Sequence, residues 1–220
     1  MFSSTTIQMI FIGMQESLYM TLFSTACAYI IGLPLGILLV ITDKDGIRPS
    51  RLINSILGFV VNVLRSVPFL ILMVTVMPLT RAIAGTTIGP KAAVVSLIIA
   101  AAPFIARLVE SSLKEVDQGV VEAAWSMGAS PWHIISKVLI PEAKPSLLVG
   151  SAIAVTTILG YSAMAGFIGG GGLGDIAIRY GYHRKETDVM LVTVILLVIV
   201  VQILQELGMW LSKKSDKRIS

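Results

Sequence analysis

The chain has 220 residues, of which 55% are hydrophobic and only 14% are charged, and its formal net charge is +4 at pH 7. Soluble domains usually carry about 25% charged residues, so this composition excludes an ordinary water-soluble globule and indicates a protein that lies in lipid. The single cysteine, Cys27, lies in an apolar run and cannot form a disulfide within the chain, so nothing indicates an oxidised, disulfide-stabilised fold.

Five stretches are long and apolar enough to cross a bilayer, because about 20 mainly apolar helical residues span the hydrocarbon. They lie near residues 18–41, 56–79, 92–109, 146–168 and 188–211. We therefore expect an all-α integral membrane protein with five transmembrane helices. The domain boundaries that follow are an extracytoplasmic N-terminal segment at 1–16, a transmembrane domain at 17–211 and a basic tail at 212–220. No basic residue precedes the first span, so we expect that span to be retained rather than cleaved as a signal peptide.

The basic residues are distributed unevenly between the two sides of this predicted membrane domain. Of the 17 Lys and Arg residues, eleven fall on the side that holds the C-terminus and five on the other side, while Arg65 lies within the second span. Since positively charged loops stay in the cytoplasm, we expect the N-terminus outside and the tail from Lys213 to Arg218 inside. The net charge of +4 is then explained by the excess of basic residues on the cytoplasmic side. No basic stripe interleaved with aromatic residues indicates nucleic-acid binding.

The most specific segment, from Glu122 to Pro141, is cytoplasmic in this topology. Gly128 suits the left-handed backbone that ends a helix, Ser130 can cap the start of the next helix, and Pro131 suits that helix's first position. The sequence therefore predicts two short helices that meet at a sharp joint.

The first of these short helices is suited to docking against another protein. Two alanines leave its backbone open to close approach, and a Trp and a Met beside them offer apolar contact. The predicted docking residues are Glu122, Ala123, Ala124, Trp125, Met127 and Gly128. The alternative interpretation is an ordinary interfacial loop in which a glycine ends a helix.

The spacing of this segment is Glu-Ala-Ala, three residues, Gly, nine residues and then Val138-Leu139-Ile140-Pro141, and it resembles the EAA loop of ABC importer permeases. Val138 and Ile140 stand where that family often has Ile and Leu. The resemblance implies a type I ABC importer permease fold in a bacterial inner membrane, with Glu122 to Gly128 as a coupling helix in a groove of a separate ATPase subunit. It also implies a homodimer of this chain, two ATPase subunits that use ATP and magnesium, and an extracytoplasmic substrate-binding protein. This chain itself would bind no cofactor.

A narrower resemblance, to the permease subunits of methionine importers, covers roughly residues 15–210. The segments that carry it are 62–69, 101–107, 160–166, 169–175 and 180–182. It implies that the chain translocates methionine, in its L form, its D form or both, by alternating between outward and inward access. An ABC permease for another small nutrient remains an alternative, and a secondary transporter is a further one.

No motif or cluster for catalysis is found in the sequence. A glycine-rich loop that ends in Gly-Lys-Ser or Gly-Lys-Thr does not occur, and neither a nucleophile constellation nor a metal cluster nor paired acids can be identified. Gly169, Gly171 and Gly174 match a dinucleotide-binding pattern, but they follow a membrane helix rather than a strand, so we expect a flexible turn there. The centres of the spans carry no charge, which argues against an ion-coupled carrier. We therefore expect a transport subunit that is not itself an enzyme.

The fourth span is rich in small and hydroxylic residues, which fit either close helix packing or the lining of a translocation path. Near its outer end, Tyr161, Ser162 and Met164 are predicted to contact substrate. The reason is that a thioether substrate suits an adaptable apolar surface with a few hydroxyls.

Other features are predicted to be structural. Gly32 and Gly36 have the spacing of a close helix contact. Arg107, Glu110 and Lys114 lie near the inner end of the third span, where pairing at helical spacing favours anchoring over substrate binding. Prolines at 34, 68 and 103 are predicted to kink their spans.

Overall fold

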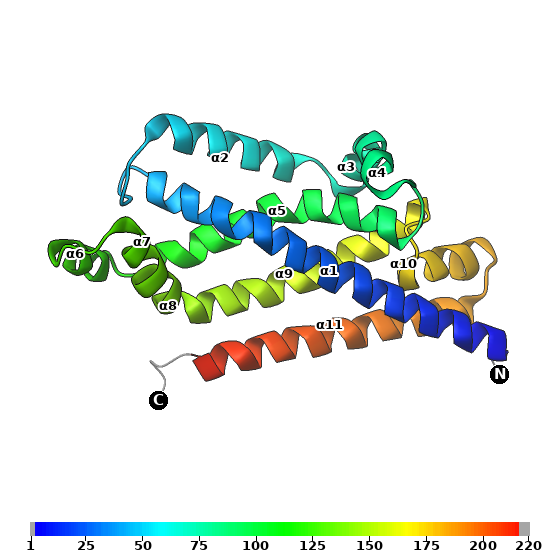
Figure 1. Ribbon diagram of the computed structural model, residues 1–220. Helices are drawn as coiled ribbons and strands as arrows, with labels where there is room; N and C mark the ends of the chain where they lie inside the picture. Colours follow the sequence, from blue (N-terminus) through cyan, green and yellow to red (C-terminus); the bar gives the residue numbers. More distant parts are fainter. Residues whose placement is uncertain (1–2, 216–220) are drawn as a thin grey trace. The chain divides into compact units, whose positions relative to one another are not determined.

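The computed structural model describes residues 3–215, and within that range every regular element is helical (Figure 1). In chain order the elements are α1 (Ser4–Thr42), α2 (Arg51–Ser66), α3 (Phe69–Thr75), α4 (Met77–Ala84), α5 (Pro90–Lys114), α6 (Gln118–Ser126), α7 (Pro131–His133), η1 (Ile134–Leu139), α8 (Ile140–Glu142), α9 (Lys144–Ala165), η2 (Gly166–Ile168), α10 (Gly172–Ile176), η3 (Ala177–His183) and α11 (Thr187–Ser215). Of the η elements, η1 and η3 are π-helical and η2 is a 3₁₀ helix. The predicted all-α fold class is confirmed.

Four helical segments are long and apolar enough to cross a membrane, namely α1, α5, α9 together with η2, and α11. A fifth candidate consists of α2 and α3, which are bent by 102° at the short break between them. The number of predicted spans therefore agrees with the structure when this bent pair counts as one span.

The second predicted span, 56–79, is not a single helix. Its chain breaks around Pro68, which has an extended conformation with φ −57° and ψ 136°. Proline lacks the N–H that would continue the helix, and it pushes the residue before it out of the helical region. The kink predicted at this proline is therefore a complete break, whereas α1 and α5 continue through Pro34 and Pro103.

α1 begins well before the first predicted span, 18–41. Two polar side chains of α1 that precede this predicted span have partners in α10. The Glu16 carboxylate accepts a hydrogen bond from the Gly172 N–H at 2.8 Å, and the Ser17 hydroxyl accepts one from the Leu173 N–H at 2.9 Å. Glu16 and Ser17 can therefore lie within α1, because their side chains satisfy N–H groups at the start of α10.

The chain forms two compact units, each built from stretches that are distant in sequence. Unit 1 contains the chain up to Ala28 together with Val67–Ala101 and Ala154–Gln205, and unit 2 contains Tyr29–Ser66, Ala102–Ile153 and the chain from Glu206 onward. Large side chains that are fully buried mark a core in each unit. They include Met20, Leu97, Leu159 and Leu173 in unit 1, and Leu39, Ile105, Leu113 and Ile134 in unit 2.

Within unit 2, α1 and α5 approach each other closely at two glycines. A Cβ atom added to Gly32 would lie 2.8 Å from the carbonyl oxygen of Ala102, and one added to Gly36 would lie 2.6 Å from that of Ala106. Side chains at these two positions would force the helices apart. The predicted helix contact at Gly32 and Gly36 is confirmed.

Candidate functional site

α6 is a short helix whose two ends are fixed by nearby residues. At its start, the Asp117 side chain accepts a hydrogen bond from the Gly119 N–H at 2.7 Å. After its end, Gly128 has a φ of 80°, in the left-handed region that glycine enters without a steric cost. The Gly128 N–H donates to the carbonyl oxygen of Trp125 at 2.9 Å. The predicted role of Gly128 in ending this helix is confirmed.

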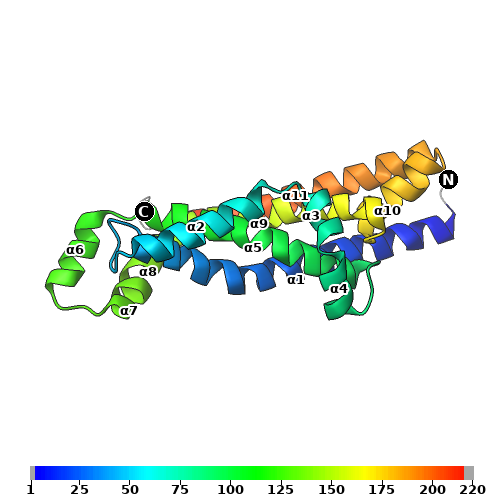
Figure 2. The same cartoon turned by 90° about the horizontal axis from the view of Figure 1, so that it is seen from above.

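The following helix, α7, begins as the sequence predicts. The Ser130 hydroxyl caps it by accepting a hydrogen bond from the His133 N–H at 3.3 Å, and Pro131 occupies its first turn. The chain then continues into η1, where Ile134 and Leu139 are buried and against which α6 packs. In both views α6, α7 and α8 gather at one end of unit 2 (Figures 1 and 2).

The predicted docking residues of α6 do not all face the same way. Trp125 is 50% exposed and Met127 is 81% exposed, and the side chains of Glu122 and Ala123 are exposed as well. Ala124, by contrast, is only 7% exposed. The small size of Ala124 therefore serves packing inside unit 2, while Ala123 leaves the outer face of the helix accessible.

A further exposed residue, Trp132, was missed by the sequence reasoning. It is 72% exposed at the start of α7. The available signal was a large aromatic residue directly after a helix-starting proline, where few partners within the chain can cover it. Trp132 on α7 and Trp125 and Met127 at the end of α6 are all exposed, and we call these three side chains the α6–α7 surface. Trp and Met are enriched in protein–protein interfaces, so this surface is suited to a protein partner.

The three predicted pathway residues are separated by the structure into two environments within unit 1. Tyr161 is partly buried and stacks on Phe69, with ring centroids 4.7 Å apart and an interplanar angle of 6°. Met164 is 45% exposed one helical turn further on. Ser162 is buried, and its hydroxyl donates to the carbonyl oxygen of Leu159 at 2.8 Å. Tyr161 and Met164 share one side of α9, and Ser162 belongs to the interior of the unit.

The charged cluster predicted on the third span is a network that centres on Glu110, which is 8% exposed. Its carboxylate accepts hydrogen bonds from Arg107 and, at 2.9 Å, from the Lys114 ammonium. Lys114 also contacts the Asp43 carboxylate at 2.6 Å. The Lys114 hydrogen bond holds the pKa of Asp43 below its usual value. The two cations and two carboxylates neutralise one another.

Arg107 extends this network from α5 to α2. One guanidinium nitrogen, Nη2, donates to the Asn62 side-chain oxygen at 2.8 Å and to the carbonyl oxygen of Gly58 at 3.3 Å. The other, Nη1, bonds Glu110. A guanidinium can bridge several acceptors because its donors diverge in a rigid plane. We call the set Asp43, Gly58, Asn62, Arg107, Glu110 and Lys114 the α2–α5 charge network.

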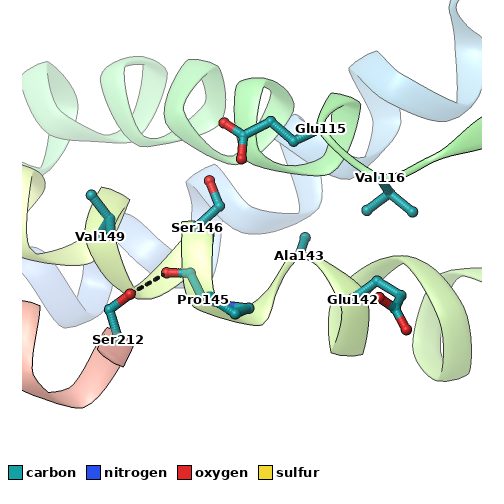
Figure 3. Close-up of a pocket in the computed structure, with 8 residues that line it drawn as sticks. All are labelled: Glu115, Val116, Glu142, Ala143, Pro145, Ser146, Val149 and Ser212. Atoms are coloured by element: carbon teal, nitrogen blue, oxygen red, sulfur yellow. Dashed lines mark hydrogen bonds between the residues drawn. The ribbon is translucent and has the colours of Figure 1, made fainter. Parts of the chain in front are cut away.

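A cavity of about 410 Å³ lies in unit 2 between the end of α5, α8, the start of α9 and α11 (Figure 3). The Ser212 hydroxyl donates to the carbonyl oxygen of Pro145 at 2.9 Å, which ties α11 to the start of α9. The lining residues are Glu115, Val116, Glu142, Ala143, Pro145, Ser146, Val149 and Ser212. Two carboxylates and no basic side chain are among these lining residues.

Comparison with known families gives a match over most of the chain. The profile of a family described as "Binding-protein-dependent transport system inner membrane component" matches residues 32–220. The matched range contains α6 with Gly128, the α6–α7 surface and the α2–α5 charge network.

Comparison with individual proteins also gives matches that cover most of the chain. The chain is 52% identical over 203 residues to the probable D-methionine transport system permease protein of Vibrio cholerae, covering 92% of this chain and 90% of the relative. It is 45% identical over 181 residues to the methionine import system permease protein of Bacillus subtilis, covering 82% of each. Among solved structures, a chain of the MetNI methionine ABC transporter in an inward-facing conformation superposes with a TM-score of 0.97 at 42% identity, covering 98% of this chain and 100% of that one.

Proposed function

The chain belongs to the family of binding-protein-dependent transport system inner membrane components, and from this membership we propose that it is the permease subunit of an ATP-driven importer of methionine. Its substrate is the L form, the D form or both. The printed names of the relatives, which refer to D-methionine and to methionine, support this choice over another small nutrient.

The observation that carries the proposal is the exposed α6, which is the coupling helix in this interpretation. It is a short helix held at both ends, with Trp125 and Met127 uncovered and with Glu122 and Ala123 beside them. An apolar, aromatic surface of this kind gains free energy when a partner removes it from water. The ATPase subunit is that partner, and Trp132 adds to the surface with which this chain binds it.

The assembly that follows contains two copies of this chain and two ATPase subunits, with a methionine-binding protein on the extracytoplasmic side. Five spans are few for enclosing a path, and a two-fold dimer is the commonest way to complete one. ATP and magnesium are used by the ATPase subunits, and this chain contributes no catalytic residue. The ATPase cycle changes the access of the path by favouring one conformation over the other.

Substrate passes Tyr161 and Met164 on α9. The stacked pair of Tyr161 and Phe69 offers an aromatic face, and the exposed thioether of Met164 offers an adaptable apolar contact. Ser162 contributes through the packing of α9, because its hydroxyl already has a partner within the helix.

The topology of the chain has the N-terminus outside and the C-terminus in the cytoplasm, with residues 17–211 as the transmembrane domain between segments 1–16 and 212–220. The excess of basic residues on the C-terminal side supports this orientation. Reporter fusions at residue 86 and at residue 128 test it. Activity of a cytoplasmic reporter at 86 and not at 128 would reverse the assignment.

The experiment that tests the function is uptake of labelled methionine in cells that lack this chain and every other methionine carrier. The wild-type chain should restore uptake, and unlabelled L- and D-methionine should compete while other amino acids should not. The double variant Glu122→Arg/Gly128→Val should reach the membrane at wild-type levels but restore no uptake. Full uptake by this variant would overturn the role of α6.

A matched control for this variant exists in unit 1. Gly85 ends α4 with a φ of 73°, and a Cβ there would meet no atom within 4 Å, just as at Gly128. Glu186 is exposed like Glu122. The control variant Glu186→Arg/Gly85→Val therefore imposes the same charge change and the same backbone strain in unit 1, far from α6 in sequence. This control variant should retain methionine uptake. In the assay with the wild-type chain, competition by a different nutrient would mean that this nutrient, and not methionine, is the substrate.

A further inference from the structure

The α2–α5 charge network ties α2 and the loop before it to the helix that leads into α6. Lys114 is the last residue of α5, and its contact with Asp43 holds the α1–α2 connection at that point. α6 begins four residues later, after the buried Val116 and the capping Asp117. A groove of about 350 Å³ is lined jointly by the loop residues 43–47 and by the start of α6.

Apart from the network, α2 is held by a small apolar cluster and by Asn54, whose Nδ2 donates to the carbonyl oxygen of Leu39 on α1 at 2.7 Å. Val61 is the buried residue of α2, and it packs in a small cluster with Leu39 and Ala106. Much of the remaining apolar surface of the helix is exposed, with Phe59 at 68%. At Gly58, the atom nearest to an added Cβ is Nη2 of Arg107, at 3.5 Å. The guanidinium is therefore the side chain that faces α2 at this turn.

Arg107 is directed between helices, although the side chain of Lys114 at the end of the network is 45% exposed. A basic residue that only anchors a span extends its head group to the interface and needs no partner on another helix. Arg107 instead divides its donors between Glu110 on α5 and two acceptors on α2. Glu110, at 8% exposed, is removed from solvent and depends on its two cations. Breaking such a buried arrangement leaves an uncompensated charge, so the network favours one fixed register of the two helices.

We propose that Arg107 and Asn62 are positioning residues that make α2 follow the movement of the coupling helix. The inference rests on the proposed function, because it assigns to α6 the contact with the ATPase. When α6 is displaced during the ATPase cycle, α5 and the network carry α2 with it. Without the network, α6 and α5 move while α2 lags, so ATP is hydrolysed with less transport.

Two variants test this inference without removing the cation on which Glu110 depends. Arg107→Lys keeps a positive charge beside Glu110, but a single ammonium at that position cannot also reach the two acceptors on α2. Asn62→Ala removes an acceptor from the α2 side, and Asn62 is exposed, so the fold does not depend on it. The matched control is Arg179→Lys, which makes the same change at an exposed arginine paired with Asp175 four residues earlier.

The measurement is the ratio of ATP hydrolysed to methionine imported by the complete complex with its binding protein in proteoliposomes. Each variant should keep ATP hydrolysis near the wild-type rate and raise this ratio roughly tenfold, within the range by which network residues alter coupling. The double variant should be no worse than either single one, because both break the same connection. The ratio for Arg179→Lys should equal that of the wild type.

An unchanged ratio in both variants would overturn the inference, and so would hydrolysis and import that fall together by the same factor. The latter result would mean that the network determines only how much complex assembles. The wild-type complex separates this inference from the proposed function. If it imports no methionine, the proposed function fails and the inference fails with it, whereas a result confined to the variants bears on the inference alone.

Discussion

Two glycine turns in this chain exist for opposite physical reasons. At Gly128, after α6, an added Cβ would meet no atom within 4 Å, and glycine is required because φ is 80°. At Gly174, within α10, the φ angle is not positive, but an added Cβ would lie 2.2 Å from the carbonyl oxygen of Ala163. The first turn is open, and the second is closed by the backbone of α9.

The open turn belongs to a surface that is free to bind another protein, and the closed turn belongs to the packed interior of unit 1. The open turn leaves Trp125 and Met127 uncovered, as a surface for another protein requires. The closed turn is held by α9 at Ala163 and by the side chains of Glu16 and Ser17, which cap the start of α10. The glycine run at 169–174 is therefore a packed corner of unit 1, whereas its composition alone indicates a flexible turn.

The largest effect is expected for Gly174→Ala, which should destabilise unit 1 by about 3 kcal/mol, the upper end of overpacking costs. The new methyl group meets backbone atoms of Ala163, which cannot turn aside as a side chain can. SDS titration of the purified protein in mixed micelles measures this loss. The control is Gly160→Ala in α9, where an added Cβ meets nothing within 4 Å. Equal stability of the two variants would contradict the closed character of the corner.

The second effect is a contrast between two neighbouring alanines of α6, the helix that ends at the open turn. Ala124→Leu should cost about 1–3 kcal/mol, because Ala124 is 7% exposed and packs inward. Ala123→Leu should stay within about 0.5 kcal/mol of the wild type, as exposed substitutions do. In uptake assays normalised to protein level, Ala123→Leu should show the larger loss. A larger loss for Ala124→Leu would mean that the inward face of α6 also binds the partner.

The open turn could be predicted from the sequence because its causes are local. Gly128, Ser130 and Pro131 each act on backbone groups within three residues, as capping interactions do. The same holds for the break at Pro68, which was predicted as a kink. Trp132 was overlooked, since exposure of a single aromatic residue depends on whether any other part of the chain covers it.

The closed corner could not be predicted, because its causes lie far apart in the chain. The hydrogen bond from Gly172 to Glu16 joins residues 156 positions apart. The sequence analysis assigned no role to Glu16 or Ser17. The sequence also did not show which side of α9 is buried, since small residues occur all around this helix. Ser162 therefore could not be placed in the interior, away from Met164, before the structure was known.

The third effect tests the support that α1 gives to the closed corner. Ser17→Ala and Glu16→Ala should each lower stability by about 1 kcal/mol, the usual cost of losing a helix cap. Glu16→Gln keeps an oxygen that can accept the Gly172 N–H and should lose less. Differential scanning fluorimetry in detergent ranks the three variants. If Glu16→Gln is as unstable as Glu16→Ala, the negative charge matters more than the hydrogen bond.

The fourth effect is expected for Gly128→Ala, which should cost about 1 kcal/mol of stability, because a left-handed backbone costs an L-residue roughly that amount. Gly85→Ala should cost the same, since its φ is 73° and its surroundings are equally open. Their effects on transport should differ. Strain at Gly128 shifts Met127 on the α6–α7 surface and should reduce uptake, whereas strain at Gly85 lies far from it in sequence and should not. Equal uptake by the two variants would mean that the α6 end need not hold one shape, and that any helix-ending turn there allows docking.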